Sequence, residues 1–167
     1  VTALISAWTG TNIQLGSDTA GTTVTIDNLS TAIVTAATAT AGNTLVSLVW
    51  TNPVDADFHS VIVLRRTGGV VADTPVEGTT YVVTNTIGAS TVVCVTAGTS
   101  CTDTGLTNGT AYYYKIYAKD SNGNYSATGV VPTGSPATPN VTTLATGTDP
   151  GNSSIAPSGA ATNAGAF

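Results

Sequence analysis

The stretch from Thr110 to Asp120 constrains the fold more than any other, because its side chains change character at every position. In a β-strand they divide between two faces, with Tyr112, Tyr114, Ile116 and Ala118 on one and Tyr113, Lys115, Tyr117 and Lys119 on the other. The turn-forming residues 121–124 follow, and residues 125–131 are predicted to return beside this strand. The pattern therefore predicts two β-strands joined by a turn.

Further segments have the same character, and turn residues separate them. Strands are predicted at residues 1–5, 23–26, 32–34, 45–50, 58–66, 79–83 and 91–95. Threonine makes up 34 of the 167 residues, and its branched side chain favours strands over helices. Short strands at this spacing predict an all-β chain built as a β-sandwich.

Charge and metal-binding residues are too scarce for several functions. The net charge of −5 and the pI of about 4.2 argue against binding to nucleic acid or to an anionic membrane surface. One histidine and two cysteines, with no CxxC, provide no recognisable zinc site, and we predict no metal and no cofactor. No apolar run reaches the length of about 18 residues that a membrane span needs.

The segment Leu106-Thr107-Asn108-Gly109-Thr110-Ala111-Tyr112, with the alternating strand and the 120–124 turn, resembles the fibronectin type III fold. Leu106 and Tyr112 are similar to the ends of its tyrosine corner, and Trp50 is similar to its core tryptophan. Residues 50–58 resemble copies found in large bacterial surface proteins. The resemblance implies a sandwich of two sheets, but this fold serves mainly as a spacer, adhesion or interaction module and says little about function.

Three regions follow from these patterns. The resemblance implies that residues 41–133 form a fibronectin type III/Ig-like β-sandwich. Residues 1–40 are expected to be an incomplete strand-rich region, and residues 134–167 are a segment rich in Gly, Ser, Pro and Thr that is the candidate donor strand. The fold class we predict is therefore an all-β sandwich of this kind, with additional N- and C-terminal β segments.

Cys94 and Cys101 lie on either side of the short turn Thr96-Ala97-Gly98-Thr99-Ser100. We predict a disulfide across this turn, which closes a small ring and stabilises the fold by roughly 2.5 kcal/mol in the chain-entropy model. A catalytic dithiol would need closer spacing and a helix N-terminus. The disulfide implies an oxidising compartment, and we predict an extracellular or cell-surface location.

Two further groups of residues were considered for catalysis or metal binding, and the sequence supports neither strongly. His59 is close in sequence to Asp55 and Asp57, but no nucleophile elbow accompanies it, so an ordinary strand histidine is favoured over a catalytic triad. Asp55-Ala56-Asp57 and Asp120-Ser121-Asn122-Gly123-Asn124 resemble pieces of calcium loops, but the second lacks the bidentate Glu of a full loop. We predict no enzyme activity.

The four basic residues are predicted to lie together. The resemblance implies that the strands carrying Arg65 and Arg66 and carrying Lys115 and Lys119 are neighbours, with Tyr113 and Tyr117 on the same outward face as the lysines. Two interpretations remain open. The side chains pair and stack among themselves within the sheet, or they form an interaction face for an acidic patch on a neighbouring copy.

Five Asn-x-Ser/Thr sequons are candidate glycosylation sites, namely Asn28, Asn108, Asn124, Asn140 and Asn152. Several would arise by chance in a chain this rich in asparagine and threonine. In an extracellular protein they remain candidates for attached glycans.

The two terminal regions have apolar patterns that need cover, yet each is too small to bury them alone. We therefore expect the two terminal regions either to pair with each other within one molecule or to pair between molecules. Pairing between molecules gives a head-to-tail homopolymer, in which a C-terminal donor strand adds to the next copy's sheet and Ile155 and Phe167 fill pockets.

The function we predict is therefore an extracellular structural subunit of a pilus-like or sheath-like filament, with copies of itself as partners. The alternative is an adhesin or spacer module of a larger surface protein, binding glycans or other surface proteins through Tyr113, Tyr117 and the loops. An enzyme or enzyme accessory domain is the least supported class.

Overall fold

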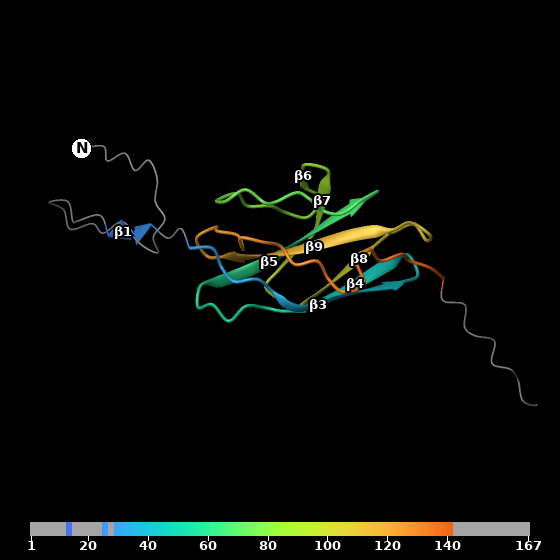
Figure 1. Cartoon of the computed structure of the whole chain (residues 1–167), viewed down its shortest axis with the longest axis horizontal. Coiled ribbons are helices and arrows are strands. Elements are labelled where there is room, and N and C mark those ends of the chain that lie inside the picture. Colours follow the sequence, from blue (N-terminus) through green and yellow to red (C-terminus); the bar gives the residue numbers. More distant parts are fainter. Residues whose placement is uncertain (1–12, 15–24, 27–28, 142–167) are drawn as a thin grey trace, which may run out of the picture.

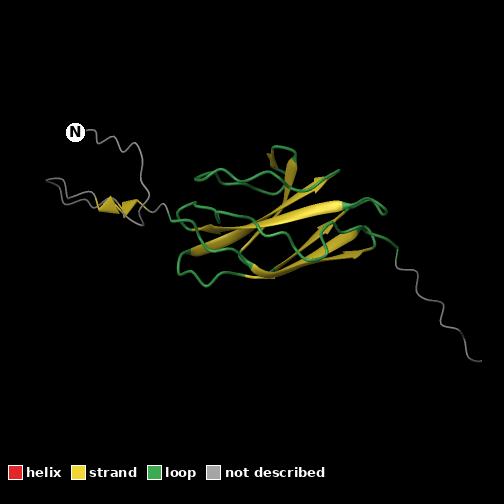
Figure 2. Cartoon of the chain, in the orientation of Figure 1, coloured by secondary structure: helices red, strands yellow, loops and turns green. Residues whose placement is uncertain are grey.

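The computed structural model describes residues 13–14, 25–26 and 29–141, and this part of the chain is all-β. A three-stranded and a four-stranded antiparallel sheet form the two layers of the body (Figures 1 and 2). The all-β prediction is confirmed, and two facing antiparallel sheets are the arrangement of a β-sandwich. Among the described residues, no helix is long and apolar enough to cross a membrane.

The three-stranded sheet has the order β3-β4-β8, with β3 at Thr35–Gly42, β4 at Leu45–Thr51 and β8 at Ser100–Thr104. Its register places Thr40 opposite Ser47, and Ser47 opposite Thr102. Because strand side chains alternate between faces, these hydroxyl groups share the outer face while the neighbouring side chains point inward. The small inward residues of β3 are Ala37 and Ala39, both buried.

The four-stranded sheet has the order β6-β7-β5-β9. Its strands are β5 (Phe58–Thr67), β6 (Thr86–Ile87), β7 (Ser90–Thr96) and β9 (Tyr112–Asp120). The chain then returns along β9 through isolated bridges, Lys119 to Tyr125, Ile116 to Val130 and Tyr112 to Ala137. The returning segment also contacts the other sheet, because Thr133 bridges to Thr38 of β3. It therefore closes one side of the sandwich.

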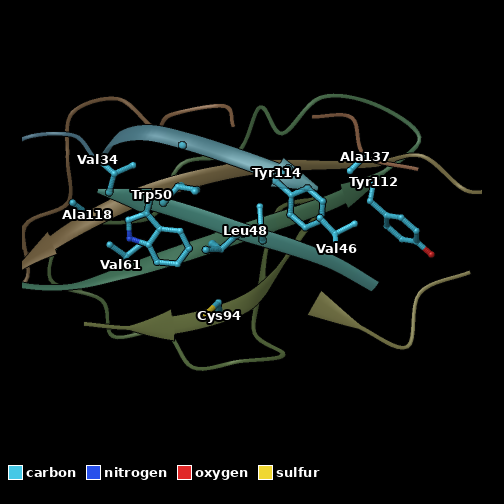
Figure 3. Close-up of a cluster of buried hydrophobic side chains, with 14 of the residues drawn as sticks. Val34, Val46, Leu48, Trp50, Val61, Cys94, Tyr112, Tyr114, Ala118 and Ala137 are labelled. Atoms are coloured by element: carbon cyan, nitrogen blue, oxygen red, sulfur yellow. The ribbon is translucent and has the colours of Figure 1, made fainter. Parts of the chain in front are cut away.

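The core between the sheets contains the inward side chains of both layers (Figure 3). Trp50 is its largest member and is 2% exposed. Its indole nitrogen donates to Asn52 Oδ1 at 2.8 Å, and Asn52 Nδ2 donates to Ala97 O at 2.9 Å. The tryptophan thus buries its ring while its one polar atom remains hydrogen bonded.

Tyr112 has the contact expected of a tyrosine corner. Its hydroxyl accepts a hydrogen bond from Thr107 N at 3.0 Å, and Leu106 is buried in the same core. Such a contact ties the start of a strand to the loop before it. The core positions predicted for Trp50, Leu106 and Tyr112 are therefore occupied as expected.

The packed body extends beyond residues 41–133, the limits predicted from the sequence. Val34 and Ala137 both belong to the core, and Asn140 N donates to Gly42 O at 3.1 Å. The reason is that β3, which precedes the predicted limit, completes the three-stranded sheet. The short strand predicted at 32–34 is wrong, since the strand begins at Thr35.

The strand predicted at residues 79–83 is also wrong. A turn interrupts the backbone here: Asn85 N donates to Val82 O at 3.1 Å, and Asn85 Oδ1 accepts from Val82 N at 2.9 Å. Thr84 has a φ of 80°, which no strand allows. The short strand β6 follows this turn, and β8 is a strand that the sequence patterns did not indicate.

Of the N-terminal region, β1 (Ile13–Gln14) pairs antiparallel with β2 (Thr25–Ile26), within the strand predicted at 23–26. The strand predicted at residues 1–5, the candidate donor residues Ile155 and Phe167, and the sequons at Asn28 and Asn152 lie outside the described residues.

We expect Val46→Ala to lower the free energy of unfolding by about 2 kcal/mol, because it removes buried methyl groups and leaves a cavity. Val46 is 0% exposed, whereas Val54 is 99% exposed, so Val54→Ala is the matched control and should change stability by less than about 0.5 kcal/mol. Urea unfolding of both variants makes the comparison. Equal losses would contradict the assignment of the core.

Candidate functional site

The sheet face predicted to be open for interaction is largely covered. The connection between β5 and β6, residues 68–85, packs on the outer face of the four-stranded sheet and forms a second apolar cluster. This cluster consists of Ile62, Leu64, Val71, Ile87, Val92, Tyr117 and Tyr125, with Tyr81 and Tyr113 packed against it. Tyr117 is 1% exposed, so its predicted place on an open face is wrong.

Two tyrosine hydroxyls hold the connection against the sheet. Tyr117 Oη donates to Asp73 O at 3.0 Å, and Tyr125 Oη donates to Thr79 O at 2.8 Å. The carboxylate of Glu77 accepts from Tyr125 N at 2.7 Å. Burial, and then the neighbouring Tyr81 and Glu77, together raise the pKa of Tyr125 to about 12.

The two lysines of β9 stack on these aromatic rings. Lys115 Nζ lies 5.5 Å from the ring centre of Tyr117, and Lys119 Nζ lies 5.6 Å from that of Tyr125. Lys119 Nζ also donates to Thr80 Oγ1 at 3.2 Å. Of the two interpretations left open by the sequence, stacking within the sheet therefore describes the lysines. Arg66 is half-buried, and its Nη1 donates to Val70 O at 3.3 Å.

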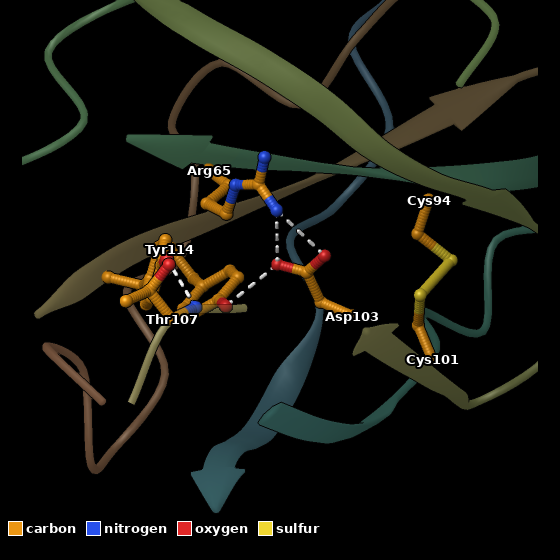
Figure 4. A network of polar contacts seen from close by, with 7 residues as sticks. Arg65, Cys94, Cys101, Asp103, Thr107 and Tyr114 are labelled. Carbon is orange, nitrogen blue, oxygen red and sulfur yellow. Dashed lines mark hydrogen bonds and ion pairs between the residues drawn. A yellow bond between two sulfur atoms is a disulfide. The ribbon is translucent and has the colours of Figure 1, made fainter. Parts of the chain in front are cut away.

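Arg65 lies opposite Tyr114 in the register of the sheet and joins the two sheets (Figure 4). Its Nη1 atom lies 2.9 Å and 3.1 Å from the two carboxylate oxygens of Asp103 in β8. The hydroxyl of Tyr114 in β9 donates to the same carboxylate at 2.8 Å. Burial, and then the Asp103 charge, raise the pKa of Tyr114 well above its usual range.

The network around Asp103 was not anticipated, although one signal for it is in the sequence. Asp103 comes two positions after Cys101, and strand residues two apart share a face. A disulfide that points inward from Cys101 therefore places Asp103 inward as well. A carboxylate in that position needs a cation, and Arg65 is the partner that the fold supplies.

The predicted disulfide between Cys94 and Cys101 is confirmed. It joins β7 of one sheet to β8 of the other, as Figure 4 shows. Cross-linking the sheets at this side stabilises the sandwich where the returning C-terminal segment does not reach. A disulfide is compatible with a secreted or extracellular protein.

A groove lies beside the disulfide, between β7 and β8. Among its lining residues are Thr91 and Val92 of β7, Thr102, Asp103 and Thr104 of β8, and Arg65. Apart from the Arg65–Asp103 ion pair, these side chains carry no charge. The groove thus offers apolar and hydroxyl groups at an edge of the three-stranded sheet.

The residues considered for catalysis are not brought together as a triad. His59 is exposed, and its Nδ1 lies 3.0 Å from Ser60 Oγ. Asp55 instead caps the segment before β3, because its Oδ2 accepts from Thr31 Oγ1 at 2.8 Å and from Ala32 N at 2.6 Å. These hydrogen bonds lower the pKa of Asp55, the one from Ala32 contributing most.

The resemblance of residues 120–124 to a calcium loop has a structural explanation. Asp120 is 1% exposed, and its Oδ1 accepts from Asn122 N at 2.9 Å and from Asn124 N at 2.8 Å. Its Oδ2 accepts from Asn124 Nδ2 at 2.8 Å. Both carboxylate oxygens therefore stabilise the turn after β9.

The sequons differ in their access to solvent. Asn140 is exposed, and Asn108 is half-buried with its side chain bonded to Thr44 N and to Asn43 Oδ1. Asn124 is only 8% exposed, and its amide nitrogen is bonded to Asp120. In the folded protein, the nitrogen of Asn124 that would carry a sugar is therefore already engaged in a hydrogen bond.

No family model matches the chain, and no curated protein matches it.

We expect Tyr125→Phe to reduce the loss of stability at high pH. An unfolded tyrosine ionises near pH 10 and folded Tyr125 near pH 12, so stability is lost as the pH rises from about 10 to 12. The variant should be less stable than the parent at pH 7, because it loses the hydrogen bond to Thr79. Above pH 10, its free energy of unfolding should fall less steeply with pH than that of the parent. Urea unfolding between pH 7 and 12 measures the free energy of unfolding of both proteins. If that free energy falls equally steeply with pH in the variant and the parent, the prediction is contradicted.

We expect Asp103→Asn to lower the free energy of unfolding by about 1–3 kcal/mol, because Arg65 then loses its ion pair in a partly buried site. Asp57→Asn is the matched control, since the Asp57 carboxylate makes no ion pair or hydrogen bond within the described part of the chain. The two variants are compared by chemical unfolding. Equal effects would argue against a role for the network in joining the sheets.

Proposed function

We propose that this chain is an extracellular structural subunit that polymerises head to tail into a pilus-like or sheath-like filament by β-strand addition between copies. The observation that carries the proposal is the position of the chain ends on the sandwich. The chain enters at one end of the long axis and leaves at the other (Figure 1). Strands donated from one end of each copy to the next would build a linear assembly.

Hydrogen bonds place the entry and the exit of the described chain at opposite ends of the β3–β4 hairpin. Ala32 N donates to Asp55, just after the Thr51 end of β4, whereas Asn140 N donates to Gly42 O, beside the Leu45 end. The described chain therefore leaves the body, at residues 140–141, at the end farthest from its entry. Within residues 142–167, Asp149 is the only charged side chain, which suits a segment that adds to another copy's sheet.

We also propose that the body is a fibronectin type III-like module. The sheet orders β3-β4-β8 and β6-β7-β5-β9, the buried Trp50 and the hydrogen bond from Thr107 to Tyr112 support this assignment. The disulfide supports an extracellular location. The scarcity of charge, 8% of residues, suits a chain whose surface is covered by neighbouring copies.

The alternative, a spacer or adhesin module within a longer surface protein, has one specific observation in its favour. Chain ends at opposite poles also suit modules strung in tandem on a single chain. Electron microscopy of the purified chain separates the two functions. Regular fibres support the filament, and monodisperse particles that bind a glycan array support the adhesin.

We expect deletion of residues 150–167 to abolish fibre formation and leave the sandwich folded, because the deletion removes the candidate donor residues but none of the described core. Negative-stain microscopy and light scattering report assembly, and circular dichroism with urea unfolding reports folding. Fibres formed by the folded, shortened chain would rule out the C-terminal segment as the connector.

A further inference from the structure

The outer edge of β8 has backbone groups that pair with nothing in the described structure. Trp50 N donates to Thr99 O at 2.9 Å, which makes these opposite residues a hydrogen-bonded pair. In an antiparallel ladder such pairs alternate with pairs whose N–H and C=O groups point outward. The register Ser47 to Thr102 therefore turns the backbone groups of Ser100, Thr102 and Thr104 away from β4, toward the open edge.

The other sheet edges within residues 29–141 are obstructed. On β3, Ala37 O and Ala39 N already bond to Thr133. The segment that returns along β9 contains Pro132 and Pro136, which cannot donate to a ladder. At the remaining edge, β6 has only 2 residues. Edge strands are usually protected by such features, and β8 has neither a proline nor a lysine.

Asp103 is the one feature of β8 that resembles edge protection, since an inward-pointing charge discourages pairing. Here the charge is already matched, because Arg65 contributes an ion pair and Tyr114 a hydrogen bond. The groove between β7 and β8 opens directly beside this edge. An added strand would therefore find both free backbone groups and a hollow for one of its side chains.

A segment of the C-terminal region matches this edge in length and chemistry. Residues 152–156, Asn-Ser-Ser-Ile-Ala, lie between Gly151 and Pro157, and β8 likewise has 5 residues. The segment is uncharged, and Ile155 is its single large apolar side chain. Residues 142–151 precede it, and ten extended residues span up to about 35 Å. That reach exceeds the roughly 30 Å of the 9-residue strand β9.

From these observations we infer that the free edge of β8 is the acceptor site, and that residues 152–156 of a second copy pair with it while Ile155 enters the groove between β7 and β8. This inference rests on the proposed function and names the two surfaces that the filament contact would join. Backbone hydrogen bonds to Ser100, Thr102 and Thr104 would supply the affinity, and the groove would set the register.

Hydrogen exchange on the full chain tests the acceptor edge directly. In the monomer, the amides of Ser100, Thr102 and Thr104 should exchange quickly, and in assembled fibres their exchange should slow by about 100-fold or more. Fibres in which these amides still exchange quickly would overturn the inference but leave the proposed function standing. Absence of fibres at every concentration would overturn both.

Point variants test the two surfaces separately, each with a matched control. Thr102→Arg should abolish or strongly reduce fibre formation, whereas Thr40→Arg, in the same row of the same sheet face but on β3, should assemble as the parent does. On the donor side, Ile155→Asp should prevent assembly and Leu144→Asp, within residues 142–151, should not. Each variant is first checked for folding by circular dichroism.

Two results would contradict the pairing between copies. If Thr102→Arg folds and still forms fibres, β8 is not the acceptor. If the monomer already protects the three amides and loses that protection on deletion of residues 150–167, the segment pairs with β8 of its own chain.

Mixing a chain that has Thr102→Arg with one that has Ile155→Asp should give dimers but no long fibres, because only one functional contact remains.

Discussion

The packing of the three-stranded sheet onto the four-stranded sheet is the constraint on which the rest of the structure depends. Val46, Leu48 and Trp50 of β4 fill the space between the layers, and β3 contributes only alanines there. With this core in place, the described chain enters and leaves the body at opposite poles, and β8 becomes an outer strand. The features on which the proposed assembly depends therefore follow from how the sandwich is closed.

The two open sides of the sandwich are closed by different means. On one side, the segment after β9 bridges the sheets through its bonds to β3 and β9. On the other, the disulfide and the Arg65–Asp103–Tyr114 network connect the layers through side chains only. Side-chain links hold the sheets together without using the backbone of β8, which is why its edge remains free for pairing.

Much of the fold could be predicted from periodicity, and the failures have a common cause. β4, β5, β7 and β9 were located because their alternating apolar residues reflect one buried face. β3 and β8 were missed because their inward residues are small or polar, namely alanines, Cys101 and Asp103. Nor could alternation show that residues 68–85 cover the outer face of β9, since that contact joins segments distant in sequence.

The sequence alone determined the all-β class, the disulfide and the shortage of charge, because each depends on local spacing or composition. The core positions of Trp50 and Tyr112 were expected from the resemblance of short local motifs to fibronectin type III. Tertiary structure decided which charged groups meet and which edge stays open. Arg65 and Asp103 are 38 positions apart, and Lys115 stacks on a tyrosine that a distant connection buries. Such contacts depend on the order of strands in each sheet, which alternation within a strand does not specify.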